Sequence, residues 1–315
     1  MADTDNGPAH AGRRIDEATG VETVGHEWDG IEELNNPLPR WWLWSFYLTI
    51  LFAIGYMIVY PAIPLLNKGT EGLWGWTSRG QLANEMKAAE QGRAKVLAAI
   101  AATPVEQIPQ KPELLAAAKA GGKAAFLVNC VQCHGSGAAG STGYPNLNDD
   151  DWLWGGSMPA IHQTITDGIR YPGNDQTRTS LMPSFGRDGL LTPAQVGDVA
   201  SHVRSLSGSE KPGAASARGA QVFADNCVAC HGPDGKGQRQ FGAPNLTDAI
   251  WLFGGSREAV IGSITNAHAG VMPAWKGRLD PVTIKMLAVY VHSLGGGEDF
   301  TEVVETPAAE ANEQP

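Results

Sequence analysis

Cysteine is scarce in this chain, with four residues among 315. All four belong to two C-x-x-C-H motifs, formed by Cys130, Cys133 and His134 and by Cys227, Cys230 and His231. No cysteine is left over for a disulfide framework, so we interpret the four as site chemistry. Basic residues are also few, and the net charge is −10. Because phosphates need a basic face, this charge argues against nucleic acid and favours partners with cationic patches.

Long apolar runs are rare as well, and one stands out. From Trp41 the chain carries no charge until Lys68, and residues 41–60 as a helix would cover the roughly 30 Å hydrocarbon layer of a bilayer. Tryptophans at one end and tyrosines toward the other are typical of interfacial aromatic belts. We expect residues 41–66 to form one transmembrane anchor, in preference to a buried core helix or a cleaved signal peptide. The few flanking charges do not decide its orientation.

The segments flanking the anchor and the motifs have distinct compositions. Residues 67–115 contain a stretch rich in Ala, Lys, Glu and Gln that ends at several prolines, which predicts a helical spacer. Residues 298–315 are rich in carboxylates and contain no lysine or arginine. We therefore expect an acidic disordered tail there.

The two motifs lie in two copies of one sequence module, whose register holds on both sides of the motif. The matched pairs include Gly122 and Gly219, Phe126 and Phe223, Pro145 and Pro244, Trp152 and Trp251, and Met182 and Met272. Self-similarity over this length indicates a duplicated structural unit. We name residues 116–207 the first repeat and residues 214–297 the second repeat, with residues 208–213 as the linker.

Each repeat ends in a predicted helix. Thr192 precedes Pro193 and Asp280 precedes Pro281, which in both cases is a capping residue followed by proline at the first helical position. The predicted fold class is therefore all-α. It consists of one N-terminal transmembrane helix, preceded by residues 1–40, and two compact helical domains.

The C-x-x-C-H motifs carry the chemistry of covalent haem attachment. Phe126, Cys130 and Cys133 recur at i, i+4 and i+7, so one helix face would carry the phenyl ring and both sulfurs. Two thiols at this spacing can bond the vinyl groups of a haem, and the adjacent histidine can hold the iron. A thioredoxin-like pair or half of a zinc site are the competing interpretations. Two copies, each with its own histidine, favour two haem c groups, with His134 and His231 as iron ligands.

The second axial ligand is expected to be a methionine. Met182 and Met272 match each other and precede a proline, whereas Met158 and Met286 have no methionine at the matched position. Thioether ligation raises the haem potential, which suits a carrier that feeds a strong oxidant.

Two alternatives to methionine ligation stay open. The matched methionines could be ordinary core residues, or a haem could have two histidine ligands through His162 or His268. These histidines, with His202 and His292, have no histidine at their matched positions. We therefore interpret all four as surface or hydrogen-bonded polar groups.

Each repeat resembles a class I cytochrome c domain, with a glycine ahead of the motif, a "PNL" element and a methionine–proline loop before the last helix. In that family the carbonyl of the middle proline orients the haem histidine. The resemblance therefore implies that Pro145 and Pro244 are the partners of His134 and His231.

The N-terminal phrase "GHEWDGIEELNNPLPRWW", residues 25–42, narrows the resemblance. Ahead of one span and two such domains, it resembles the dihaem subunit III of cbb3-type cytochrome c oxidases, and the likeness covers residues 21–297. Some members of that family carry two spans, whereas this sequence has one. The resemblance implies a bacterial inner-membrane location, with residues 1–40 cytoplasmic and both haem domains periplasmic.

The resemblance also implies a function. Electrons would come from a soluble cytochrome c or the bc1 complex and pass through a monohaem subunit to the haem–copper subunit, where oxygen is reduced. The chain would thus be an enzyme only as a subunit of this proton-translocating oxidase, since an iron held on both sides has no open position for oxygen. Two alternatives are a free-standing membrane-bound carrier for another reductase and a dihaem peroxidase. The matched Met182 and Met272 argue against a peroxidase, which needs a displaceable ligand.

Overall fold

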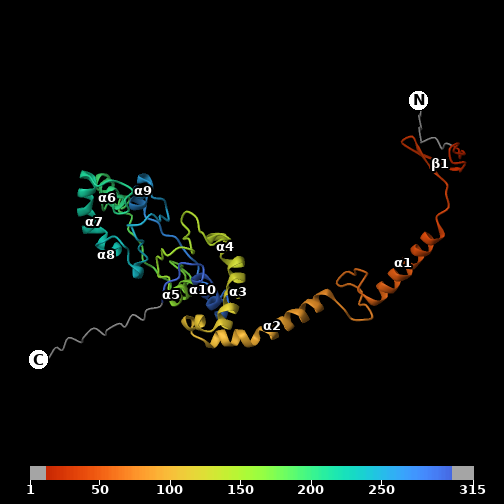
Figure 1. The fold of residues 1–315 in the computed structure, drawn as a ribbon, viewed down its shortest axis with the longest axis horizontal. Coiled ribbons are helices and arrows are strands. Elements are labelled where there is room, and N and C mark those ends of the chain that lie inside the picture. The colour runs from red at the N-terminus through yellow and green to blue at the C-terminus, as the bar shows by residue number, and fades with distance from the viewer. Residues whose placement is uncertain (1–11, 300–315) are drawn as a thin grey trace. The chain divides into compact units, whose positions relative to one another are not determined.

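The structure is a computed structural model that describes residues 12–299. The chain divides into two compact units, residues 1–90 and 91–315. Figure 1 shows the elements of each unit. They are β1 (Thr23–Trp28), β2 (Ile31–Leu34), α1 (Arg40–Val59), α2 (Ser78–Ala102), η1 (Val105–Gln110), α3 (Pro112–Asn129), α4 (Val131–His134), α5 (Met158–Asp167), α6 (Pro193–Leu206), α7 (Ala214–Asn226), α8 (Val228–His231), η2 (Arg239–Phe241), α9 (Arg257–Asn266) and α10 (Pro281–His292).

A β-hairpin precedes the apolar helix. Strands β1 and β2 pair antiparallel, and Glu27 lies opposite Glu32. Asp29 and Gly30 connect them with φ of 48° and 85°, which is the positive-φ geometry of the tight turns that favour Asp-Gly. The fold is therefore mostly helical, and the prediction of an all-α chain is not confirmed. The turn signal was present in the sequence, but the apolar periodicity that defines a strand is weak here.

Helix α1 is the candidate membrane span among the described residues. It is 20 residues long, its apolar stretch has a mean hydropathy of 1.8, and none of it is buried. The chain after α1 folds back on the helix end, where Tyr60 stacks on Tyr56 at 4.6 Å. The edges of Trp74 and Trp76 approach the Tyr60 ring at 5.3 and 5.5 Å. This aromatic cluster suits a membrane interface.

Helix packing in the second unit does not follow the order of the repeats. Helix α10, from the second repeat, packs against α3 and α5 of the first repeat, while α6 of the first repeat packs against α7 and α9 of the second. The two groups are separate in Figure 1. We call α3, α4, α5 and α10 the first bundle, and α6 to α9 the second bundle. Each repeat thus contributes its last helix, α6 or α10, to the other bundle.

The crossing of α3 and α10 explains why position 122 is a glycine. A Cβ at Gly122 would lie 2.1 Å from the carbonyl oxygen of Met286, so only glycine allows α3 to touch the α10 backbone. One turn later, the Phe126 ring packs against Tyr290 at 5.5 Å.

The second bundle repeats this arrangement with different residues. A Cβ at Gly219 would lie 2.1 Å from the carbonyl oxygen of Asp198 on α6. Phe223 packs against the His202 ring at 5.2 Å. The same helix crossing is therefore built twice, each time from both repeats.

The predicted helix starts are confirmed. The Thr192 hydroxyl accepts a hydrogen bond from the Gln195 backbone N–H at 3.3 Å. The Asp280 carboxylate accepts one from the Thr283 N–H at 2.9 Å. Both side chains satisfy N–H groups that have no partner within the helix.

Helix α2 is fixed at its C-terminal end by α10. The Lys285 ammonium donates to the carbonyl oxygens of Ile100, Ala101 and Thr103 at 3.3, 2.9 and 2.8 Å. A cation suits this position because the helix dipole leaves negative charge there. Residues 100–103 of the predicted spacer are thereby attached to the first bundle.

Candidate haem sites

The backbone of each C-x-x-C-H motif is a helix with a break in it. Helix α3 ends at Asn129, and Cys130 caps it before the short α4. The Asn129 side chain donates to the Ala125 carbonyl at 2.8 Å, which competes with regular helix bonding. Gly135, with φ of 77°, then ends α4. The expected single helix through both cysteines is therefore interrupted at the first of them, and the second motif has the same break at Cys227.

Each motif histidine is oriented by a proline carbonyl. Nδ1 of His134 lies 3.1 Å from the Pro145 oxygen, and Nδ1 of His231 lies 3.2 Å from the Pro244 oxygen. A carbonyl only accepts, so Nδ1 must carry the proton and Nε2 keeps its lone pair for a metal. Burial lowers the pKa of both imidazoles from the ordinary value, which favours the neutral, ligating form. The partners implied by the family resemblance are confirmed.

The first cysteine of each motif is unsuited to thiolate chemistry. Burial, and secondarily the neighbouring Cys133, raises the pKa of the Cys130 thiol to about 11. Burial and Cys230 do the same for Cys227. A redox dithiol needs the opposite shift. Within residues 12–299, no group of three or more His, Cys, Asp or Glu side chains is arranged to hold a metal ion. This geometry fits thioether attachment of haem better than a redox pair or a zinc site.

A loop of the second repeat that contains Met272 packs on the first bundle. We name residues 272–275 the second methionine loop. Met272 packs against the core that contains Phe126, and Cys130 packs against the same core. Its N–H donates to the Ile169 carbonyl at 3.0 Å and its carbonyl accepts from the Ile169 N–H at 2.9 Å. The Trp275 N–H donates to the Ile165 carbonyl at 3.1 Å, so this loop is attached to the end of α5.

The second bundle is arranged reciprocally. We name residues 182–185 the first methionine loop. Phe185 of this loop is buried in the core that contains Phe223 and contacts Cys227. The Ser184 hydroxyl donates to the carbonyl of Asn266, the last residue of α9, at 2.8 Å. The Met182 side chain in this loop is 37% exposed.

Two further methionines and two histidines pack in the core or have a stacking or hydrogen-bond partner. Met158 and Met286 are buried in the core of the first bundle. His268 stacks on Phe253 at 3.8 Å between ring centroids, and Nε2 of His292 donates to the Glu298 carbonyl at 2.9 Å. Hydrophobic packing or a neutral partner thus accounts for each of these side chains.

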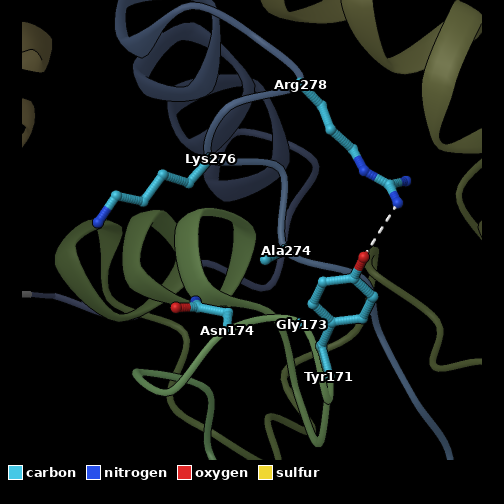
Figure 2. A pocket seen from close by; sticks show the side chains of 6 residues that line it. All are labelled: Tyr171, Gly173, Asn174, Ala274, Lys276 and Arg278. Carbon is cyan, nitrogen blue, oxygen red and sulfur yellow. Dashed lines mark hydrogen bonds between the residues drawn. The ribbon is translucent and has the colours of Figure 1, made fainter.

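A small polar cavity marks where the two repeats meet beside the second methionine loop. It has a volume of about 240 Å³ and is lined by Tyr171 and Asn174 from one repeat and Ala274, Lys276 and Arg278 from the other. Figure 2 shows the Arg278 guanidinium reaching the Tyr171 hydroxyl, to which it donates at 3.2 Å. This contact again joins the chain after α5 to the chain after Met272.

Sequence reasoning assigned no role to three residues in this region. Trp154, buried between the repeats, lies under the guanidinium groups of Arg170 and Arg178 at 5.9 and 5.4 Å. The two arginines lie in the part of the first repeat between α5 and Met182, which is longer than its counterpart in the second repeat. This extra length was the available signal.

Three family models match the chain. They are the N-terminal domain of cytochrome oxidase-cbb3, FixP, over residues 20–67, cytochrome c over residues 119–207, and cytochrome c oxidase, cbb3-type, subunit III, over residues 214–291. Together with the two histidine–proline sites, they define the class of protein: a cytochrome c with two domains.

Relatives along nearly the whole chain make the assignment specific. The chain is 55% identical over 285 residues to the cbb3-type cytochrome c oxidase subunit FixP of Bradyrhizobium sp.. The matched residues make up 90% of this chain and 98% of the relative. The chain is 54% identical to the subunit CcoP of Cereibacter sphaeroides, over 88% of this chain and 95% of that one. The chain belongs to the FixP/CcoP family, subunit III of cbb3-type cytochrome c oxidases. It binds two haem c groups covalently, one for each cytochrome c domain.

Proposed function

We propose that this chain accepts electrons from a periplasmic cytochrome c or the bc1 complex and relays them to the oxygen-reducing haem–copper subunit of its oxidase. A monohaem cytochrome c subunit is the intermediate carrier. The observation that supports this proposal most strongly is the pair of haem sites, each built around a histidine with its Nδ1 bonded to a proline carbonyl. Membership of the family of oxidase subunits also supports it.

The proposed topology combines α1, the candidate span among residues 12–299, with the orientation that the family resemblance implies. Residues 41–66 anchor the chain in the bacterial inner membrane, residues 1–40 are cytoplasmic and the haem domains are periplasmic. Supporting observations are the length and exposure of α1 and the aromatic cluster at its C-terminal end. Residues 1–11 and 300–315, which include most of the predicted acidic tail, lie outside the described residues.

The proposed ligands are the residues predicted from the sequence, but their pairing crosses the repeats. Cys130 and Cys133 attach a haem whose iron is held by His134 and Met272. The supporting contacts are those of the second methionine loop with the Cys130 core and the end of α5.

The second haem is held reciprocally. Cys227 and Cys230 attach it, and His231 and Met182 hold its iron, because the first methionine loop packs on α9 and the Cys227 core. Assignment of each methionine to the haem of its own repeat is the simpler expectation from sequence. The packing favours the exchanged pairing.

The role of the protein side chains is to hold and orient. Haem supplies reversible one-electron exchange at its iron when bound. The proline carbonyls fix the imidazole rings and their tautomers. The methionine loops would supply the second protein ligand of each iron, which would leave no free position for oxygen. These residues therefore favour electron transfer without substrate binding.

The experiment uses the purified oxidase complex, with a specific protease site inserted after the exposed Leu66. Cleavage should release a soluble fragment that carries both haems and still exchanges electrons with cytochrome c. Oxygen uptake driven by cytochrome c should then be lost. A small reductant that reduces the remaining subunits directly should still support oxygen uptake, which controls for damage to the oxidase. Unchanged cytochrome c oxidation after the fragment is washed away would contradict the proposed role.

A further inference from the structure

Arg170 occupies an unusual backbone position between the two bundles. It follows Gly168, which ends α5, and it has a φ of 50°. A residue other than glycine rarely adopts this left-handed conformation, and where it does the conformation is often tied to function. The equivalent place after α9 is Ala269, so only one of the two repeats carries a guanidinium here.

The Arg170 side chain joins the two chain segments that lead into the methionine loops. Its Nε donates to the carbonyl of Gly270 at 2.8 Å, and its Nη1 donates to the carbonyl of Ser180 at 2.8 Å. Gly270 is two residues before Met272, and Ser180 is two residues before Met182. One planar guanidinium therefore bonds the backbone next to both proposed sulfur ligands.

The surroundings make these bonds structurally important. Arg170 packs over Trp154 and is half-buried, and burial lowers its pKa from the ordinary value. Arg170 forms no salt bridge within residues 12–299, so the two carbonyls are the chief compensation for its desolvation. A fork of N–H donors suits this arrangement because it reaches two acceptors with fixed geometry.

We propose that Arg170 is a positioning residue that sets the placement of both methionine loops, and hence links the axial ligation of the two haems. The proposal rests on the proposed crossed ligation. The carbonyls of Ser180 and Gly270, each two residues before a proposed ligand, are bonded to one rigid group. Loss of that group loosens both loops, and each sulfur then spends less time on its iron. Thioether ligation raises the potential of a haem, so both potentials fall together.

The test compares Arg170→Gln and Arg170→Lys with Arg178→Gln in the full-length chain carrying both haems. Arg178 is the matched control because it packs over the same Trp154, but its side chain donates to Thr164 and Gln163 of α5 and not to the carbonyls of Ser180 or Gly270. The readouts are the thioether-to-iron charge-transfer absorption of the oxidised protein and a redox titration resolved for each haem. Haem content and helical circular dichroism monitor folding.

We expect Arg170→Gln to reduce the charge-transfer absorption of both haems and to lower both potentials, while Arg178→Gln retains both. Arg170→Lys keeps the charge without the planar fork, so it should give an intermediate loss at both haems. It also provides the result if the glutamine variant does not fold. Full signatures in both Arg170 variants, a change at one haem only, or equal losses in the Arg178 control would overturn the proposal. If the unaltered chain has no such absorption, the proposed methionine ligation itself is wrong, which separates the two failures.

Discussion

Met272 and Ile169 form a reciprocal pair of backbone hydrogen bonds, 3.0 and 2.9 Å long, although they belong to different repeats. The pair brings the loop after α9 to the end of α5. With α10 packed on α3, it makes the second half of the second repeat part of the first bundle. The two haem sites are therefore not independent modules, and damage to one repeat should reach the haem bound by the other.

The glycine crossing gives a direct test of this packing. We expect Gly122→Ala to lower the free energy of unfolding by about 1–3 kcal/mol, because its Cβ would meet the backbone of Met286, which cannot move aside. Thermal or urea unfolding of the protein would measure the change.

Gly262→Ala is the control for that substitution. Gly262 lies in α9, and a Cβ there meets nothing within 4 Å. Alanine should therefore stabilise the helix by up to about 1 kcal/mol. If both alanine variants shifted stability in the same direction, the close crossing of α3 and α10 would be contradicted.

A pH dependence follows from a half-buried carboxyl group before α5. Burial, followed by the charges of Asp248 and Asp149, raises the pKa of Asp151 to about 6. Between about pH 4 and pH 6 the folded protein holds a proton on Asp151 that the unfolded chain has released. The free energy of unfolding therefore falls as the pH rises through this range. Asp151→Asn should raise the free energy of unfolding at pH 7 by roughly 1 kcal/mol, a figure discounted for solvent screening.

Urea unfolding at several pH values would check this. The gain from Asp151→Asn should shrink toward zero as the pH falls from 7 to 4. Exposed Asp175 is the control, and its asparagine variant should follow the unaltered protein. A gain that stayed constant over this range would show that the Asp151 charge is not its cause.

Glu298 closes the C-terminal end of the described chain onto both repeats. Its carboxylate pairs with Arg239 and accepts the Gly156 N–H at 2.6 Å. We expect Glu298→Gln to lower the free energy of unfolding by roughly 1 kcal/mol at low ionic strength, because a partly exposed charge pair contributes modestly. The loss should shrink in high salt. Asp299→Asn is the matched control, and an equal effect there would exclude a specific role for Glu298.

The sequence predicts a large part of this structure because its signals are local. Capping at Thr192 and Asp280 depends on neighbouring residues, and so does the spacing of the motif cysteines. The exchange of α6 and α10 could not be predicted, because both helices carry the same apolar pattern and either can cross a glycine of α3 or α7. Arg170 was missed for a related reason, since its role depends on Gly270 and Ser180 meeting only in the folded chain. The boundaries of the domains stay predictions.

The crossed ligation is tested most directly in a chain that carries one haem. Cys227→Ser combined with Cys230→Ser leaves the haem attached at the first motif, and the thioether-to-iron absorption of the oxidised protein then reports one iron. In this background we expect Met272→Ala to abolish the absorption and Met182→Ala to retain it, because Met272 lies in the Cys130 core. Loss of the absorption in Met182→Ala, with its retention in Met272→Ala, would contradict the crossed pairing.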